Sequence, residues 1–131
     1  MATGALGKIF RDGDVIIRQG DIDDCMYVIQ EGKVEIVLES GGQENVLTVL
    51  DTGDFFGEMA LFDKDVRSAT VRAVGDAKVL TVDKKSLMRR FLEDPSLAFR
   101  LVETMSKRIR ELQDKVAKQE AELEALRSST V

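Results

Sequence analysis

A single uninterrupted helical pattern, from Pro95 to about Arg127, constrains this chain more than any other feature of its sequence. Pro95 is the only proline, and it stands where a helix accepts one, at the first helical position. Nothing after it breaks a helix, which would be about 50 Å long at the usual rise per residue. A helix of that length cannot lie wholly on one small domain, so we expect part of it to meet a partner.

The apolar residues of this helix repeat with heptad spacing. β-Branched residues at three of the four a positions favour a parallel two-stranded coiled coil. The flanking charges agree, because Lys115 would face Glu120 of a second copy and Glu122 would face Arg127. Packing along its own domain is the alternative, which fits less well because the domain ends before the helix does. The a and d positions are Val102, Met105, Ile109, Leu112, Val116, Gln119, Leu123 and Leu126.

Upstream of the helices, residues 8–83 read as short β segments separated by turn residues. Val34, Ile36 and Leu38 alternate along one such segment, and two adjacent glycines at 41–42 mark a hairpin loop. Roughly seven or eight strands at this spacing predict an antiparallel jelly roll. Asp83 then suits the N-cap of a first helix. The predicted fold class is mainly β with α: a jelly-roll domain at 8–94 that contains a short helix, and the long helix at 95–127.

The composition excludes several classes of function. The chain has no His and one Cys, which argues against His/Cys metal sites, His-based acid–base catalysis and disulfides. Cys25 is expected to be a buried, reduced thiol. The net charge of -5 argues against a nonspecific grip on nucleic acid. No signal peptide and no run of roughly 18 apolar residues is present, so we expect a soluble, cytoplasmic protein without a membrane partner.

The stretch FGEMALFDKDVRSATVRA, residues 56–73, holds Glu58 and Arg67, each flanked by small or apolar residues. A short helix after Gly57 would present free amides to an anion, and Arg67 would add a planar fork of donors suited to phosphate. Glu58 could accept hydrogen bonds from a sugar hydroxyl. A plain ion pair between Glu58 and Arg67 fits the spacing equally well. The small residues that leave room for a ligand are Gly57, Ala60, Ser68 and Ala69.

The same stretch resembles the phosphate-binding cassette of the cyclic nucleotide-binding domain family. That pattern is F-G-E-x-A-L, a short gap, and then R-(S/T/A)-A-(T/W)-V-x-A. The preceding segment DGDVIIRQGDIDDCMYVIQEGKVEIV also has the family's spaced glycines, and the two helices that follow match as well. The resemblance covers roughly residues 9–116 and includes the catabolite activator-like regulators and the regulatory subunits of cAMP-dependent protein kinase. It reduces the Glu58–Arg67 ion pair to a minor possibility.

The resemblance implies a role for each cassette residue. Arg67 would bind the equatorial phosphate oxygens of a 3′,5′-cyclic nucleotide, and Glu58 would accept the ribose 2′-OH beside the backbone of Gly57. Ser68 would offer its amide and hydroxyl to the phosphate. Apolar residues on the strands would form a wall of the pocket, although such residues more often belong to the hydrophobic core, which is the alternative for them. The remaining implied site residues are Met59, Ala60 and Ala69 in the cassette, and Ile36, Leu47 and Val49 in the wall.

In this family the long C-terminal helix closes over the base. The resemblance places Arg108 near the pocket, where it could pair with Glu58. Leu112 and Gln113 fall where catabolite activator-like regulators present small hydroxyl residues to adenine, so here the pattern is not followed. The alternative for Arg108 and Gln113 is a solvated or interhelical position on the coil. Those regulators carry Ser at the position of Ser68 and respond to cAMP, which leads us to favour cAMP over cGMP.

The sequence therefore predicts a cyclic-nucleotide receptor that is not an enzyme and that holds no metal. Its expected partners are the nucleotide, a second copy of the chain through the coiled coil, and a downstream protein of unknown identity. No helix-turn-helix pattern follows the long helix, so binding of nucleic acid by this chain alone is not expected. Two alternatives are a constitutive dimerisation adapter with a vestigial pocket and a sensor fragment of a longer transcription regulator.

Overall fold

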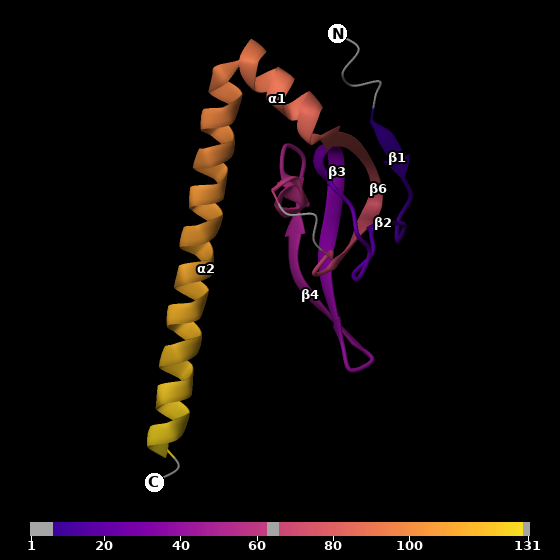
Figure 1. The fold of residues 1–131 in the computed structure, drawn as a ribbon. Coiled ribbons are helices and arrows are strands. Elements are labelled where there is room, and N and C mark those ends of the chain that lie inside the picture. The colour runs from indigo at the N-terminus through magenta and orange to yellow at the C-terminus, as the bar shows by residue number, and fades with distance from the viewer. Residues whose placement is uncertain (1–6, 63–65, 130–131) are drawn as a thin grey trace. The chain divides into compact units, whose positions relative to one another are not determined.

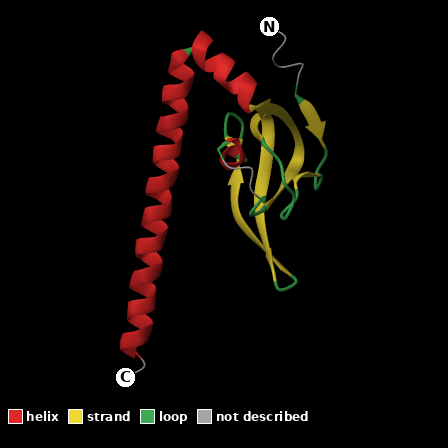
Figure 2. Ribbon diagram, in the orientation of Figure 1, coloured by secondary structure: helices red, strands yellow, loops and turns green. Residues whose placement is uncertain are grey.

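The fold is described by a computed structural model that covers residues 7–62 and 66–129. Figures 1 and 2 show all the strands and one short helical turn before residue 84 and the two longer helices after it. The helices are the single 3-10 turn η2 (Glu58–Leu61), α1 (Lys84–Glu93) and α2 (Pro95–Ser129). The strands are β1 (Lys8–Phe10), β2 (Val15–Ile17), β3 (Cys25–Ser40), β4 (Gln43–Leu50), β5 (Phe55–Phe56) and β6 (Thr70–Asp83).

All strand pairs in the sheet are antiparallel. The main path runs β1-β6-β3-β4, while β2 pairs with β6 and β5 pairs with β3. The two longest strands, β3 and β6, lie at the centre of this path and form the longest ladder, from Cys25↔Asp83 to Val37↔Thr70. The predicted antiparallel β architecture followed by a long C-terminal helix is confirmed.

The strand count differs from the sequence prediction, since the described residues form six strands instead of seven or eight. Instead of many short strands, the sheet contains two long ones, β3 and β6, which curve without ending (Figure 1). In β3 Gly32, whose φ is 96°, lies where the register with β6 shifts. A Cβ at Gly32 would lie 2.5 Å from the carbonyl oxygen of Asp76. Because glycine has no Cβ, the backbones of β3 and β6 can approach closely here while their pairing continues on both sides.

The core lies among the central strands. Val34 and Val37 of β3 are completely buried. Ile36 and Leu50 are partly buried and pack against the same core. The buried residues of the main cluster are Ile17, Ile29, Val34, Phe56, Val71, Ala73, Ala77 and Val79.

The two helices begin as their sequences predict. Asp83 Oδ1 accepts a hydrogen bond from the Ser86 amide at 2.7 Å, so Asp83 caps α1. Asp94 accepts from the Ser96 amide at 3.2 Å, and Pro95 is the first residue of α2. The chain forms two compact units that divide after Leu87. No helix in the described part of the chain has the length and apolar character needed to cross a membrane.

Candidate functional site

The segment that carries the predicted cassette begins at β5. Phe55 and Phe56 are buried, and their backbones pair with Val28 and Tyr27 of β3. The chain then turns at Gly57, whose φ of 76° suits glycine. The expected short helix is present as the four-residue 3-10 turn η2, in which Ala60 and Leu61 are buried. Core packing on both sides of Gly57 therefore fixes this end of the site.

The other end of the site is held by backbone hydrogen bonds around Arg67. The Arg67 amide donates to the Asp21 carbonyl at 2.7 Å, and its own carbonyl accepts from the Gly20 amide at 2.9 Å. Next to it, Val66 forms a β-bridge with Ile22. The backbone at Arg67 is thus secured to the loop that precedes β3.

The side chain of Arg67 is buried, with 6% of its surface exposed. Its Nη1 donates to the Gly57 carbonyl at 2.9 Å, and its Nη2 donates to the Cys25 carbonyl at 2.6 Å. Nη2 also lies 3.3 Å from Asp23 Oδ2, and the guanidinium carbon lies 5.9 Å from the centre of the Tyr27 ring. These contacts join β5, the start of β3 and the cassette at one charged group.

One nitrogen of the Arg67 guanidinium group lacks a hydrogen-bond partner in the described structure. This nitrogen, Nε, is buried. A buried donor without a partner costs about 1–3 kcal/mol, and more when it belongs to a charged group. An anion that accepted this hydrogen bond would remove that cost, as a phosphate oxygen can do. The site is therefore suited to a small anion.

The carboxylate that contacts Arg67 belongs to Asp23. Sequence analysis predicted neither Asp23 nor Tyr27 for this site. Spacing gave no signal for them, because tertiary contacts bring this segment beside Arg67: strand pairing of β3 and the backbone hydrogen bonds between Arg67 and residues 20–21. The ion pair that the described structure gives Arg67 is therefore with Asp23.

Hydrogen bonds fix the Asp23 carboxylate. Oδ2 accepts from the Tyr27 hydroxyl at 2.8 Å, and Oδ1 accepts from the Asp24 amide at 2.7 Å. Partial burial opposes ionisation of Asp23, but these hydrogen bonds and the charge of Arg67 outweigh it, so the pKa of Asp23 lies below its ordinary value. Burial and the hydrogen bond to Asp23 raise the pKa of Tyr27 to about 12. The Tyr27 ring also stacks on Phe56, with centroids 5.3 Å apart.

Cys25 lies beside this carboxylate and is half-buried, not fully buried as expected from the sequence. Ligand atoms of Asp23, Asp24 and Cys25 lie within 4.8 Å of one another, a separation that a metal ion could bridge. Burial and the neighbouring carboxylates, however, raise the pKa of the Cys25 thiol to about 11. Since a thiol binds metal as the thiolate and Asp23 is engaged by Arg67, this cluster suits a metal poorly.

The other predicted cassette residues differ in exposure. Glu58 is the first residue of η2 and is half-buried, whereas Met59 is exposed. Ser68 is exposed and Ala69 is half-buried, just before β6. The cassette thus has an accessible edge at Met59 and Ser68 beside the buried Arg67.

The three predicted wall residues do not share one environment. Leu47 and Val49 on β4 are 49% and 52% exposed, so they are not plain core residues, whereas Ile36 packs against the main cluster. In the β3–β4 register, Ile36 is opposite Thr48 and Val49 is opposite Glu35. Since neighbouring residues of a strand point to opposite faces, Ile36 and Val49 lie on different faces of the sheet.

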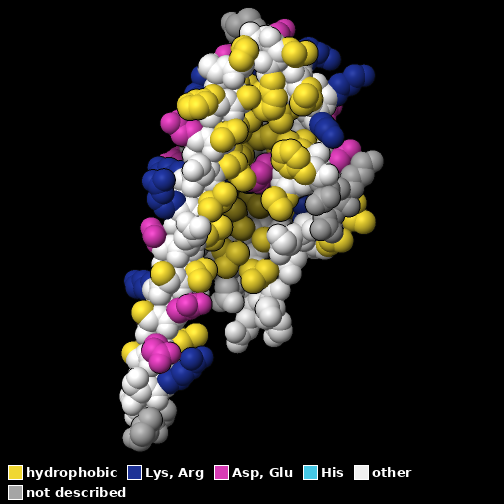
Figure 3. All heavy atoms as spheres, turned by 60° about the vertical axis from the view of Figure 1, so that its left-hand side comes forward, with side chains coloured by type: hydrophobic (Ala, Val, Ile, Leu, Met, Phe, Trp, Pro, Cys, Tyr) yellow, Lys and Arg dark blue, Asp and Glu magenta, His cyan; other side chains and the backbone are white. Residues whose placement is uncertain are grey.

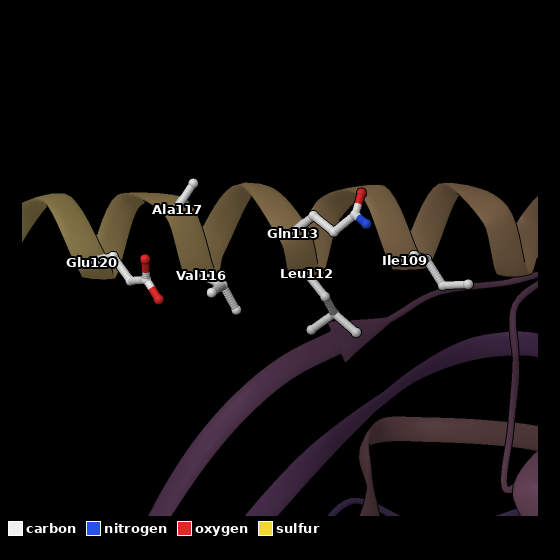
Figure 4. Close-up of a pocket in the computed structure, with 6 residues that line it drawn as sticks. All are labelled: Ile109, Leu112, Gln113, Val116, Ala117 and Glu120. Carbon is white, nitrogen blue, oxygen red and sulfur yellow. The ribbon is translucent and has the colours of Figure 1, made fainter.

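The predicted residues of the long helix lie on α2. Arg108 is half-buried, whereas Leu112 and Gln113 are exposed. Both exposed residues line a pocket on α2, where Ile109, Leu112 and Val116 project from the same side of the helix and Ala117 from the opposite side (Figure 4). Figure 3 shows apolar side chains exposed along this helix. The pairing of Arg108 with Glu58 remains a prediction.

Comparison with known proteins identifies relatives of the chain. A regulatory subunit of cAMP-dependent protein kinase from Blastocladiella emersonii is 40% identical over 81 residues, which are 61% of this chain and 20% of that protein. The crystal structure of the Thermus thermophilus catabolite activator protein superposes with a TM-score of 0.73 at 30% identity, covering 87% of this chain and 55% of the other. An EAL enzyme in a cGMP-bound form gives a TM-score of 0.60 at 36% identity, covering 79% and 28%.

This chain therefore spans only part of each of these relatives. The family model described as "Cyclic nucleotide-binding domain" matches residues 8–94, which include every strand found among the described residues, η2 and α1. On this evidence, the chain belongs to the cyclic nucleotide-binding domain family.

Proposed function

We propose that the chain is a receptor for a 3′,5′-cyclic nucleotide and that cAMP is preferred over cGMP. The observation that carries this proposal is the buried Arg67, whose Nε has no partner in the described structure. The phosphate would accept from Arg67, while Glu58 would accept from the ribose 2′-OH. The names of the kinase regulatory subunit and the cyclic AMP receptor protein of Thermus thermophilus support cAMP, while the cGMP-bound EAL enzyme keeps cGMP as the second candidate.

The preference between the nucleotides would be decided at the cassette edge and on the long helix. Ser68 is exposed, so its hydroxyl is accessible to a ligand. Leu112 and Gln113 on α2 are the residues proposed to lie near the base, with Arg108 reaching Glu58. In this arrangement residues 8–94 bind the sugar phosphate, and residues 95–127 close the site and form the dimer.

The proposed dimer rests on the apolar stripe of α2. Six of its a and d residues are between 52% and 65% exposed, a degree of exposure that a second copy of the helix would reduce. Lys115 facing Glu120 and Glu122 facing Arg127 of the second copy favour parallel helices. The six exposed residues are Val102, Ile109, Leu112, Val116, Leu123 and Leu126.

We propose that the nucleotide acts by shifting a conformational population. Contacts made only when α2 covers the site would stabilise the covered, dimeric state, and a partner protein would recognise that state. A constitutive dimer with a vestigial pocket is the competing function, because pairing of the α2 stripe with a second copy does not in itself require a ligand.

Isothermal titration calorimetry with cAMP and with cGMP tests the binding proposal. We expect micromolar or tighter binding that is stronger for cAMP and that Arg67→Leu abolishes. Circular dichroism of the Arg67→Leu variant must show a folded protein, because Arg67 also contacts two carbonyls. Absence of binding heat from the unmodified chain with either nucleotide would refute the proposal.

Sedimentation velocity with and without cAMP tests the coupling. Leu112→Asp combined with Leu123→Asp places charges at one d and one a position and should give monomers, while Glu111→Asp on the exposed outer face serves as a control. A dimer that persists in the double variant would exclude the coiled coil. A wild-type dimer unaffected by bound cAMP would favour the constitutive adapter.

A further inference from the structure

The buried charge of Arg67 has a counter-ion within the protein. Asp23 Oδ2 lies 3.3 Å from Nη2 of Arg67 and accepts the Tyr27 hydroxyl at 2.8 Å. Its other oxygen accepts the Asp24 amide at 2.7 Å. Both oxygens of Asp23 are therefore held, and the carboxylate is kept toward the guanidinium.

Asp23 affects this site mainly through its negative charge and has little part in orienting the Arg67 guanidinium. The guanidinium is already oriented by the carbonyls of Gly57 at 2.9 Å and Cys25 at 2.6 Å. The 3.3 Å separation from Asp23 exceeds the roughly 2.7–2.9 Å that is usual for a charge-assisted hydrogen bond. Removing the carboxylate charge would therefore leave the geometry of Arg67 largely in place.

We propose that Asp23, positioned by the Tyr27 hydroxyl, is a resident counter-ion with which the ligand's phosphate competes for Arg67. This inference rests on the proposed function, since it concerns how tightly that site binds its anion. A phosphate at Arg67 adds a second negative charge beside a guanidinium that Asp23 already partly neutralises. Asp23 thereby stabilises the ligand-free protein and weakens binding, and Tyr27 is a positioning residue that acts through Asp23.

The competition is tested by calorimetry with cAMP on matched variants. Asp23→Asn removes the charge and keeps the shape, and it should lower the Kd about 3- to 30-fold. Asp24→Asn removes an equal charge from the adjacent exposed carboxylate and should change the Kd less than about 2-fold. Tyr27→Phe keeps the ring on Phe56 but releases Asp23, so its Kd should fall between those of the wild type and Asp23→Asn.

A second readout requires no ligand. Tyr27 is the only tyrosine and the chain has no Trp, so absorbance near the phenolate band reports this hydroxyl alone. The wild-type pKa should be about 12. In Asp23→Asn it should fall part of the way toward 10, because burial still opposes ionisation, and Asp24→Asn should change it far less.

The outcomes separate the two proposals. If the wild type binds cAMP and Asp23→Asn shifts the Tyr27 titration without tightening binding, the competition is refuted and the receptor function stands. If neither Asp23→Asn nor Tyr27→Phe lowers the Kd, the competition is equally refuted. If the wild type binds no cyclic nucleotide, the receptor proposal fails, and the competition fails with it.

Discussion

Replacing Gly57 by Ala should damage the site through a single added methyl group. The φ of Gly57 is 76°, and a Cβ built there would lie 2.8 Å from Arg67 Nη1 and 3.2 Å from Ile17 Cδ1. Arg67 cannot move aside without cost, because its Nη1 donates to the Gly57 carbonyl and its Nη2 donates to the Cys25 carbonyl. The substitution therefore combines backbone strain with displacement of the guanidinium.

The two effects have different magnitudes. The left-handed conformation costs a non-glycine residue about 1–2 kcal/mol. Loss of one hydrogen bond from a charged donor costs about 1.5–3 kcal/mol. We therefore expect Gly57→Ala to lower the free energy of unfolding by about 2.5–5 kcal/mol and to weaken cAMP binding by at least about tenfold, which corresponds to roughly 1.4 kcal/mol.

Gly53→Ala is the matched control. Gly53 also has a positive φ, 91°, but nothing lies within 4 Å of the position of an added Cβ. Urea denaturation of both variants should give the strain alone for Gly53 and the larger sum for Gly57, and calorimetry should show weaker binding only for Gly57→Ala. Equal losses of stability in the two variants, with unchanged affinity, would refute the assigned role of Arg67.

Two further predictions concern the scaffold. Gly32→Ala should prevent stable folding or cost more than Gly53→Ala, because its Cβ would lie 2.5 Å from the backbone oxygen of Asp76; thermal melts check this. Alkaline pH should destabilise the protein, because folding raises the pKa of Cys25 from 9.0 to about 11 and that of Tyr27 from 10.0 to about 12. Both groups are neutral in the folded and unfolded protein at lower pH, but as the pH rises through about 9–12 they ionise more readily in the unfolded chain, which lowers the free energy of unfolding. Urea titrations at several pH values should show that Cys25→Ser removes the part of this decline nearest pH 9–11.

The starts of the two helices were predictable from the sequence, because they depend on residues next to one another in the chain. Asp83 as an N-cap and Pro95 as the first residue of α2 follow from the chemistry of helix ends. The strand count was less predictable, because a glycine between two β segments is compatible with a turn or with a bent strand. At Gly32 the close approach of β6, which is a tertiary contact, decides for the bent strand.

The site was predictable only in part, for the same reason. The cassette pattern identifies Arg67 and Glu58 because they lie within one short stretch. Asp23 and Tyr27 lie far from that stretch in sequence and reach Arg67 through the pairing of β3 with β5 and β6. Exposure also depends on neighbours, so the half-buried thiol of Cys25 could not be distinguished from a core residue by its apolar context.

The long β3–β6 ladder also bears on how the protein acquires its fold. Its partners run from Val37↔Thr70 to Cys25↔Asp83, so every pair joins segments distant in the chain, and loop closure must precede most of the stabilising contacts. During synthesis β3 and β4 emerge from the ribosome well before β6, so the edge of β3 that pairs with β6 stays uncovered in that interval. The rate-limiting event in refolding should therefore be the joining of these two strands, with the helices forming faster.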